Sequence, residues 1–254
     1  MGIVNYNRIN QILSLSYSKG LLFSSWLEEQ GFSDQLLRKY RSSGWLEGLC
    51  RGVMYREKLP LQATTALTCF NEQLDKDYRV AALSALELAG FNHYVPMGKP
   101  LLMVAHPKGK APQWFDMDAF NRKFVLFTTD AFSNPLTTKY EIDGFKVLSS
   151  VPELAFMECL LLAPSRYRYM DLFYVMEQLT SLRPDVVQEI LTTTTNLKVK
   201  RMFLYMAEKA GHYWFDMLDT SQINLGTGKM QLAEGGTYIA KYKITIPTEL
   251  YQYE

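Results

Sequence analysis

The pattern of apolar and polar positions is most informative between Leu21 and Arg56. The pattern predicts two short amphipathic helices that meet at Gly31. Ser33 can cap the second helix with its hydroxyl, and Gly44 can end it. The apolar residues of this second helix recur at helical spacing: Leu36, Leu37 and Tyr40. One face of the helix is therefore expected to be buried, and the other face is expected to meet solvent.

Two short β-prone runs follow the second helix. Their apolar residues lie on either side of Arg51 and Gly52: Trp45, Leu46, Leu49, Val53, Met54 and Tyr55. Arg51 and Gly52 can form a tight turn that joins the two runs into a small β-ribbon. A helix, a tight turn, a basic helix and a ribbon together predict a winged helix-turn-helix. In that arrangement the second helix enters the major groove of DNA, and the wing touches the flanking backbone.

The second helix and the wing carry the candidate DNA contacts. These are long donors and one short hydroxyl: Gln35, Arg38, Lys39, Arg41, Ser42 and Arg51. A side-chain amide near the helix start can read adenine, whereas most hydrogen bonds from basic side chains go to phosphates. The same residues are also typical of a solvent-exposed helix face and of a surface turn that bind nothing. The pattern alone leaves both interpretations open.

The chain is expected to divide into two domains. Helix-breaking residues mark the boundary: Pro96, Gly98 and Pro100. Before them, helices are predicted at residues 4–17, 61–74 and 80–90, the last two as a bridge. The winged helix-turn-helix domain is therefore expected to span residues 1–95, with its core in residues 1–58. Residues 96–254 are expected to form a separate C-terminal domain.

The C-terminal part begins with strand signals and continues with helical ones. Strands are predicted at 101–106, at 123–128 and as a pair around Asp143-Gly144. Four helices follow from Val151 onward, and a glycine-punctuated end predicts a loop and a final strand or hairpin. The expected fold class is α+β: an N-terminal winged helix, then a β-rich part and a helical bundle.

The fourth of these helices has the most regular stripe of apolar residues. Its apolar residues are Val199, Met202, Phe203, Met206 and Ala210. Lys198, Lys200 and Arg201 are left around the other side, where they are expected to be exposed or at the margins. From periodicity alone they are the polar face of an amphipathic helix.

Composition narrows the class of protein. The 254 residues are 48% hydrophobic and carry 27 basic against 26 acidic side chains, so DNA contact must come from local asymmetry. Residues 1–60 hold eight Lys and Arg against five Asp and Glu, a net charge of +3.

Three widely spaced cysteines indicate neither a disulfide framework nor a zinc site. With no apolar run of signal-peptide or transmembrane length, the expected location is the cytoplasm, away from any membrane.

An enzymatic function finds little support in the motifs. Asp116 and Asp118 form an Asp-x-Asp pair that could hold a divalent metal, but the Gly-Ser signature of a nucleotidyltransferase is missing before them. The Gly226 to Lys229 stretch fails the P-loop spacing, and Met230 stands where a Ser or Thr should bind magnesium. The histidines are scattered singly. We therefore expect no catalytic set, no metal and no cofactor.

Several blocks of the sequence resemble one known family. They are, in order, WLEEQGFSDQLLRKYRSSGWLEGLCRGVMYR, AALSALELAGFNHYVPMG, VPELAFMECLLLAP, LTSLRPDVVQEIL, LKVKRMFLYMAEKAGHYWFDMLD and INLGTGKMQLAEGGTYIAKYKITIP. In these blocks the chain resembles the AbiEi antitoxins of bacterial type IV toxin–antitoxin systems, which act in abortive infection, a form of phage defence. The blocks span nearly the whole chain.

The resemblance implies a specific function. Such proteins repress their own operon by binding operator DNA through the winged helix, and the C-terminal domain counteracts a nucleotidyltransferase-like toxin. They are not enzymes. The resemblance places four of the candidate contacts on the recognition helix and one on the wing: Gln35, Arg38, Lys39, Arg41 and Arg51. It also places Lys198, Lys200 and Arg201 on an antitoxin surface. The alternatives are an uncharacterised enzyme, or a regulator of other genes, that uses the winged helix as a docking module.

Overall fold

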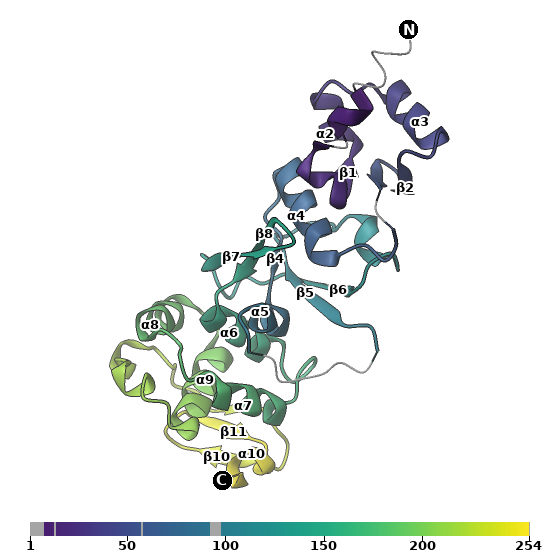
Figure 1. The fold of residues 1–254 in the computed structure, drawn as a ribbon. Coiled ribbons are helices and arrows are strands. Elements are labelled where there is room, and N and C mark those ends of the chain that lie inside the picture. The colour runs from purple at the N-terminus through teal and green to yellow at the C-terminus, as the bar shows by residue number, and fades with distance from the viewer. Residues whose placement is uncertain (1–7, 13, 57, 92–97, 254) are drawn as a thin grey trace. The chain divides into compact units, whose positions relative to one another are not determined.

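The computed structural model describes residues 8–12, 14–56, 58–91 and 98–253 (Figure 1). Helices and three sheets combine in one chain, which confirms the predicted α+β class. The chain divides into two compact units. The first comprises Met1–Val80, Pro96–Thr128 and Lys139–Ser149, and the second comprises Ala81–Val95, Thr129–Thr138 and Ser150–Glu254. Within the described ranges, no helix is long and apolar enough to cross a membrane.

The first unit begins with the predicted winged helix. Residues 8–12 are helical, and the elements that follow are η1 (Ser16–Lys19), β1 (Leu21–Phe23), α2 (Ser24–Glu29), α3 (Asp34–Ser42), β2 (Glu47–Cys50) and β3 (Val53–Tyr55). The three strands pair in the order β1-β3-β2. The helix expected from Leu21 onward therefore starts three residues late. Leu21–Phe23 is wholly buried and pairs with β3, and periodicity cannot tell so short an apolar run from a helix.

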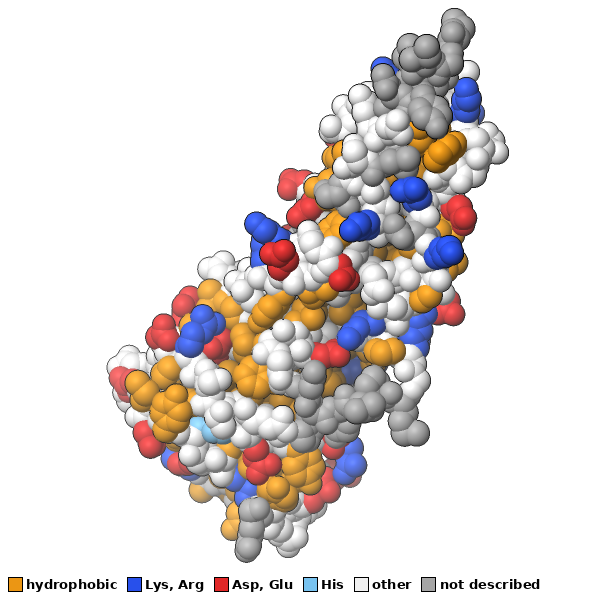
Figure 2. All heavy atoms as spheres, in the orientation of Figure 1, with side chains coloured by type: hydrophobic (Ala, Val, Ile, Leu, Met, Phe, Trp, Pro, Cys, Tyr) orange, Lys and Arg blue, Asp and Glu red, His pale blue; other side chains and the backbone are white. Residues whose placement is uncertain are grey.

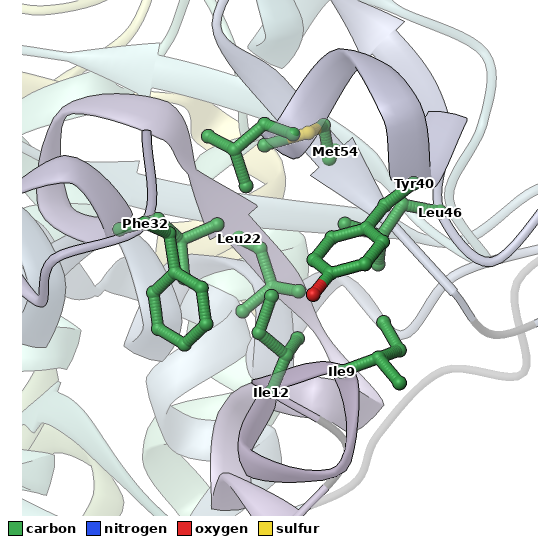
Figure 3. Packing of buried hydrophobic residues seen from close by; sticks show 9 residues of the cluster. Ile9, Ile12, Leu22, Phe32, Tyr40, Leu46 and Met54 are labelled. Atoms are coloured by element: carbon green, nitrogen blue, oxygen red, sulfur yellow. The ribbon is translucent and has the colours of Figure 1, made fainter. Parts of the chain in front are cut away.

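One hydrophobic cluster holds the winged helix together (Figure 3). Its side chains come from the first helix, β1, α2, the turn after α2, α3 and the wing, and they pack together: Ile9, Ile12, Leu22, Leu27, Phe32, Leu37, Tyr40, Leu46 and Met54. Tyr40 and Leu37 belong to α3, so burial of these side chains fixes which face of that helix looks outward. The predicted apolar face of the second helix is confirmed.

The rest of the first unit is built on a five-stranded sheet. Its elements are α4 (Ala63–Leu74), β4 (Arg79–Val80), β5 (Leu101–Ala105), η2 (Gln113–Asp116), β6 (Lys123–Phe127), β7 (Thr137–Ile142) and β8 (Phe145–Ser150). The strands are ordered β6-β5-β4-β8-β7. The predicted strands and the Asp143-Gly144 turn form as expected, and both turn residues have positive φ, 52° and 82°. Val80, the second residue of β4, was expected to open a helix, but the neighbouring strands hold it extended.

α4 is joined to the winged helix by a side-chain amide. Gln73 is buried, its Nε2 donates to the carbonyl of Leu21 at 2.7 Å, and its Oε1 accepts from the Phe23 N–H at 3.0 Å. β1 is an edge strand, and the Gln73 amide satisfies backbone groups on it that no neighbouring strand reaches. The winged helix is thereby tied to the unit that carries the sheet.

The second unit contains the predicted bundle. Its elements are α5 (Ala82–Leu88), α6 (Pro152–Leu162), α7 (Tyr169–Gln178), α8 (Pro184–Thr193), α9 (Leu197–Ala210), η3 (Phe215–Met217), η4 (Thr220–Gln222), β9 (Met230–Gln231), β10 (Thr237–Ile239), β11 (Ile244–Ile246) and α10 (Thr248–Gln252). α9 packs against α6 and α7 (Figure 1). The expected closing hairpin forms from β10 and β11, and β9 pairs parallel to β11. The short α10 was not predicted.

The predicted domain division falls at a place the structure does not describe. Residues 92–97, which include Pro96, lie outside the described ranges, so a cut between residues 95 and 96 stays a prediction. The compact units do not follow a single cut. Because β4 pairs with both β5 and β8, residues 96–128 and 139–149 group with the N-terminal elements.

Candidate nucleic-acid interface

α3 is the helix that the winged-helix arrangement would place in the major groove. The Ser33 hydroxyl accepts from the Leu36 N–H at 3.3 Å, which caps the helix as predicted. Lys39 and Arg41 lie in its last turn, where positive charge is favourable for the helix dipole. Beyond the end of the helix, Gly44 adopts φ of +74°, and its N–H donates to the Arg41 carbonyl at 3.1 Å. Local sequence is sufficient to explain both ends.

All six predicted DNA-contact residues are exposed. Five lie on α3 and one on the wing: Gln35, Arg38, Lys39, Arg41, Ser42 and Arg51. Exposure is what a contact role requires, and the role itself stays a prediction. On the face drawn in Figure 2, Lys and Arg side chains over the N-terminal elements are interspersed with Asp and Glu. Any phosphate site must therefore be local.

A groove between α2, α3 and the wing gathers three of the six residues. It has a volume of about 390 Å³, and Arg38, Arg41 and Arg51 line it. Gln35, Lys39 and Ser42 do not line it, although they are exposed on the same helix. The α3 face of the interface is thus split between an arginine-lined groove and an open flank that carries the amide, the lysine and the hydroxyl.

Two acidic residues that the sequence reasoning overlooked also line the groove. They are Glu28 and Asp34, and Asp34 forms an ion pair with Arg38, in which both side chains are more than half exposed. Their spacing of four residues on one helix was the signal that could have predicted this pair. An exposed pair of this kind contributes little to stability. The pair places the Arg38 guanidinium beside a carboxylate at the groove.

The wing is braced against α2 and within itself. The Ser24 N–H, at the start of α2, donates to the Gly52 carbonyl at 2.9 Å. Gly52 has φ of +78°, and a Cβ there would lie 3.2 Å from the Ser24 hydroxyl, so a side chain at this position would be strained. Across the ribbon, the Tyr55 hydroxyl donates to Glu47 Oε2 at 2.7 Å, and this bond raises the pKa of Tyr55. Arg51 therefore sits on a turn with a defined position.

Ser42 is less free to donate than the sequence suggested. Its hydroxyl donates to the Lys39 carbonyl within the helix at 2.9 Å, and Ser43 donates to the same carbonyl at 2.8 Å. The proton of Ser42 is therefore already used, and its oxygen can only accept unless the hydroxyl turns. Gln35 and Lys39 are exposed on the open flank, where their amide and ammonium donors can face a ligand.

The expectation that the basic block on α9 is exposed or at the margins is wrong for two of its three residues, Lys200 and Arg201. Arg201 is 1% exposed, Lys200 is 4% exposed and Lys198 is half-buried. The helix is covered on both sides, so its apolar stripe does not define the only buried face. Burial lowers the pKa of both Lys198 and Lys200. Lys200 and Arg201 therefore do not lie on an open surface, and an antitoxin role for the block stays a prediction.

Two of them hold the bundle together instead. The Arg201 guanidinium donates through Nε to the Leu225 carbonyl at 2.8 Å and through Nη1 to the Lys243 carbonyl at 3.0 Å. The Lys198 ammonium donates to the Leu161 carbonyl at 2.8 Å and to the Ala163 carbonyl at 2.5 Å, where α6 ends. Both cations therefore satisfy backbone carbonyls inside the second unit.

The other chemical motifs do not assemble into a site within the described ranges. Asp118 is exposed and forms an ion pair with Lys99, and a hydrogen bond from that lysine lowers the pKa of the carboxyl group. Over the same part of the chain, no group of three or more His, Cys, Asp or Glu side chains is placed to hold a metal ion. Gly226 lies in a loop whose backbone passes close to α9, where a Cβ would stand 2.8 Å from Leu197 Cδ1. Close packing against α9 therefore explains why this position is a glycine.

Comparisons with known proteins place these features in a family. A family model described as "Transcriptional regulator, AbiEi antitoxin, Type IV TA system" matches residues 99–247. A second, described as "Transcriptional regulator, AbiEi antitoxin N-terminal domain", matches residues 5–97. No curated protein matches the sequence. Among solved structures, the chain is similar to the RV2827C protein from Mycobacterium tuberculosis, at 13% identity, with a TM-score of 0.62 over 89% of this chain and 86% of that one. At that identity the likeness shows the fold alone.

Proposed function

Because this chain belongs to the AbiEi antitoxin family of type IV toxin–antitoxin systems, we propose that it is the antitoxin and autorepressor of such an operon. It binds operator DNA through the winged helix and acts in the cytoplasm, where that DNA lies. Through its C-terminal domain it counteracts a nucleotidyltransferase-like toxin. It does this as a regulator, without catalysis of its own.

The observation that best supports the DNA-binding part of this proposal is the groove between α3 and the wing. Arg38, Arg41 and Arg51 meet there from two elements, and the wing turn is braced by Ser24. The three guanidinium groups outnumber the two carboxylates that also line this concavity, Glu28 and Asp34, and each guanidinium can donate to phosphate oxygens in a forked geometry. Gln35 and Lys39, on the open flank of α3, are then left to meet base edges.

A titration of the full chain with DNA from upstream of its own operon tests this function. Fluorescence anisotropy over a series of salt concentrations measures affinity and its salt dependence. Replacement of Arg38 and Arg41 with Ala should reduce the slope of log affinity against log salt by roughly 0.9 for each phosphate that the variant no longer neutralises. The matched control is Lys76→Ala, which removes one exposed positive charge in the loop between α4 and β4 and should leave the slope unchanged.

Gln35→Ala separates base reading from phosphate binding. It should keep the salt slope and lower the preference for operator over unrelated DNA, since an amide contact contributes discrimination and no charge. If the full chain binds operator and unrelated DNA equally, autorepression is refuted. Binding to DNA from other loci alone would instead identify a regulator of other genes.

The antitoxin part is tested in cells. Growth is measured when the chain is expressed together with the toxin gene of the same operon, with expression of the toxin alone as the reference. Arg38 and Arg41 replaced with Ala should still restore growth when expression is driven by a foreign promoter, because repression and neutralisation are assigned to different parts of the chain. Failure of the unaltered chain to restore growth would refute the antitoxin function.

A further inference from the structure

Besides the groove beside α3, the first unit contains a second pocket. It has a volume of about 480 Å³, which is within the usual range for small-molecule sites. Its walls come from η1, the segment after β3, the start of α4, and β8 with the turn before it. All of these segments belong to the first unit. The side chains that line the pocket include Lys19, Lys58, Leu61, Thr65, Asp143 and Phe145.

The first turn of α4 leaves backbone donors at this pocket. Gln62, the N-cap residue, lines the pocket and gives the helix no side-chain cap. The Ala63 N–H donates to Asn121 Oδ1 at 2.9 Å. Among the residues that the structure describes, the N–H groups of Thr64 and Thr65 have no acceptor. α4 is twelve residues long and has no acidic residue in its first turn, so these donors and the helix dipole favour an anion.

The Thr65 side chain is independent evidence for a ligand. It lines the pocket although the residue is only 2% exposed. A Cβ at Gly20 would stand 2.8 Å from Thr65 Cγ2, so the methyl group faces Gly20 and the hydroxyl lies on another side. Within the described ranges that hydroxyl forms no hydrogen bond, whereas the Thr68 hydroxyl donates to the Thr64 carbonyl at 3.1 Å. Buried hydroxyls are nearly always bonded, so an unbonded one at a pocket indicates a polar ligand.

The charged side chains around the pocket favour a phosphate that carries hydroxyl groups. Lys19 and Lys58 are exposed, and neither forms an ion pair in the described part of the chain. Asp143 is the one carboxylate of the lining, so two positive charges stand against one negative charge. The lysines and the N–H groups can donate to phosphate oxygens, and Asp143 can accept from hydroxyl groups. Leu61 and Phe145 form an apolar wall for the rest of the ligand.

This pocket and the DNA groove lie at opposite ends of the wing strands. In the ladder of β1 and β3, the turn that carries Arg51 adjoins one end. The segments that carry Lys19 and Lys58 adjoin the other end, where Leu21 pairs with Tyr55. The two sites therefore do not compete for the same phosphate.

We propose that the second pocket binds a phosphate monoester of a sugar or a nucleoside. The phosphate lies at the start of α4, between Lys19 and Lys58, and accepts from the Thr65 hydroxyl. The sugar hydroxyls face Asp143. This site goes beyond the proposed function and does not depend on it. Because the ligand contacts both the winged helix and β8, its binding stabilises the folded first unit.

Isothermal titration of the full-length chain tests the site with four probes at one ionic strength. The probes are adenosine monophosphate, ribose 5-phosphate, inorganic phosphate and adenosine. At least one of the two monoesters should bind and raise the melting temperature with its concentration. Inorganic phosphate should bind more weakly, because it does not reach the apolar wall. Adenosine should bind at least about tenfold more weakly than adenosine monophosphate, since it lacks the charged acceptor.

Two variants remove the proposed ligand contacts. Lys19→Ala combined with Lys58→Ala should weaken binding of the monoester at least about tenfold. Both lysines are exposed, so the melting temperature without ligand should not change, and circular dichroism checks this. Thr65→Val keeps the shape of the side chain, removes the hydroxyl and should weaken binding about tenfold, as expected for one hydrogen bond to a charged group.

Each variant has a control in the same unit. Lys76→Ala combined with Lys139→Ala removes two exposed lysines that do not line the pocket. Thr68→Val removes a buried hydroxyl of α4 that is already bonded within the helix. Both controls should bind the monoester as the unaltered chain does.

Three results would overturn this inference and leave the proposed function intact. The first is no binding of either monoester by a chain that still binds operator DNA. The second is equal weakening by the control variants and the pocket variants. The third is a Lys19 and Lys58 variant that keeps monoester binding but lowers the salt dependence of operator binding, which would assign these lysines to the DNA surface.

Discussion

Arg201 offers the sharpest test of the finding that the basic block of α9 is internal. Its guanidinium donates to the Leu225 carbonyl from two nitrogen atoms and to the Lys243 carbonyl from a third. These carbonyls belong to the loop before β9 and to the turn before β11. Arg201→Met keeps much of the side-chain volume and removes the donors, and Arg201→Glu adds a negative charge that faces two carbonyl oxygens.

The expected loss of unfolding free energy follows from these hydrogen bonds. A hydrogen bond that involves a charged group contributes about 1.5–3 kcal/mol to stability. The Lys243 carbonyl also accepts from the Met230 N–H at 2.9 Å, so it keeps one partner, whereas Leu225 loses both bonds from the guanidinium. Arg201→Met should therefore lower the free energy of unfolding by about 3 kcal/mol. Arg201→Glu should cost about 5 kcal/mol, because it buries an unpaired charge.

Urea denaturation followed by circular dichroism measures the decrease in stability, and amide hydrogen exchange locates it. The exchange of residues 225–246 should accelerate before that of α3, since the bonds of Arg201 end in that segment. Arg166→Met, a replacement of an exposed arginine in the same unit, is the control and should stay within about 0.5 kcal/mol. If Arg201→Met is equally harmless, the guanidinium is not an internal donor and the surface interpretation from the sequence would be restored.

Two further predictions concern capping and pH. Ser33→Ala removes the side-chain acceptor of the Leu36 N–H at the start of α3, so it should cost about 1 kcal/mol in urea denaturation and weaken operator binding in anisotropy. Burial disfavours the charged form of Glu153, but hydrogen bonds from Arg183 outweigh it and keep the pKa of Glu153 below its ordinary value. That group therefore stabilises the fold above its unfolded-state pKa, and the difference in unfolding free energy between the unaltered chain and Glu153→Gln should shrink as pH falls below about 4.3.

The sequence by itself determined the local features of the winged helix. Ser33 caps α3, Leu37 and Tyr40 turn inward, and Gly52 closes the wing as expected. Each of these depends on neighbours within a few residues along the chain, which is the range over which periodicity and turn chemistry act. The exposure of the six candidate DNA contacts follows from the same periodicity.

Only the tertiary structure decided where longer-range partners lie. Leu21–Phe23 and Arg79–Val80 are strands because other strands pair with them, and no local pattern reveals a partner. Arg201 is internal because segments that arrive more than twenty residues later supply its acceptors. Periodicity describes one helix alone, and whether its polar face meets water depends on what else packs there. The same reason explains why Arg51 joins Arg38 and Arg41 in one groove, since folding brings the wing to α3.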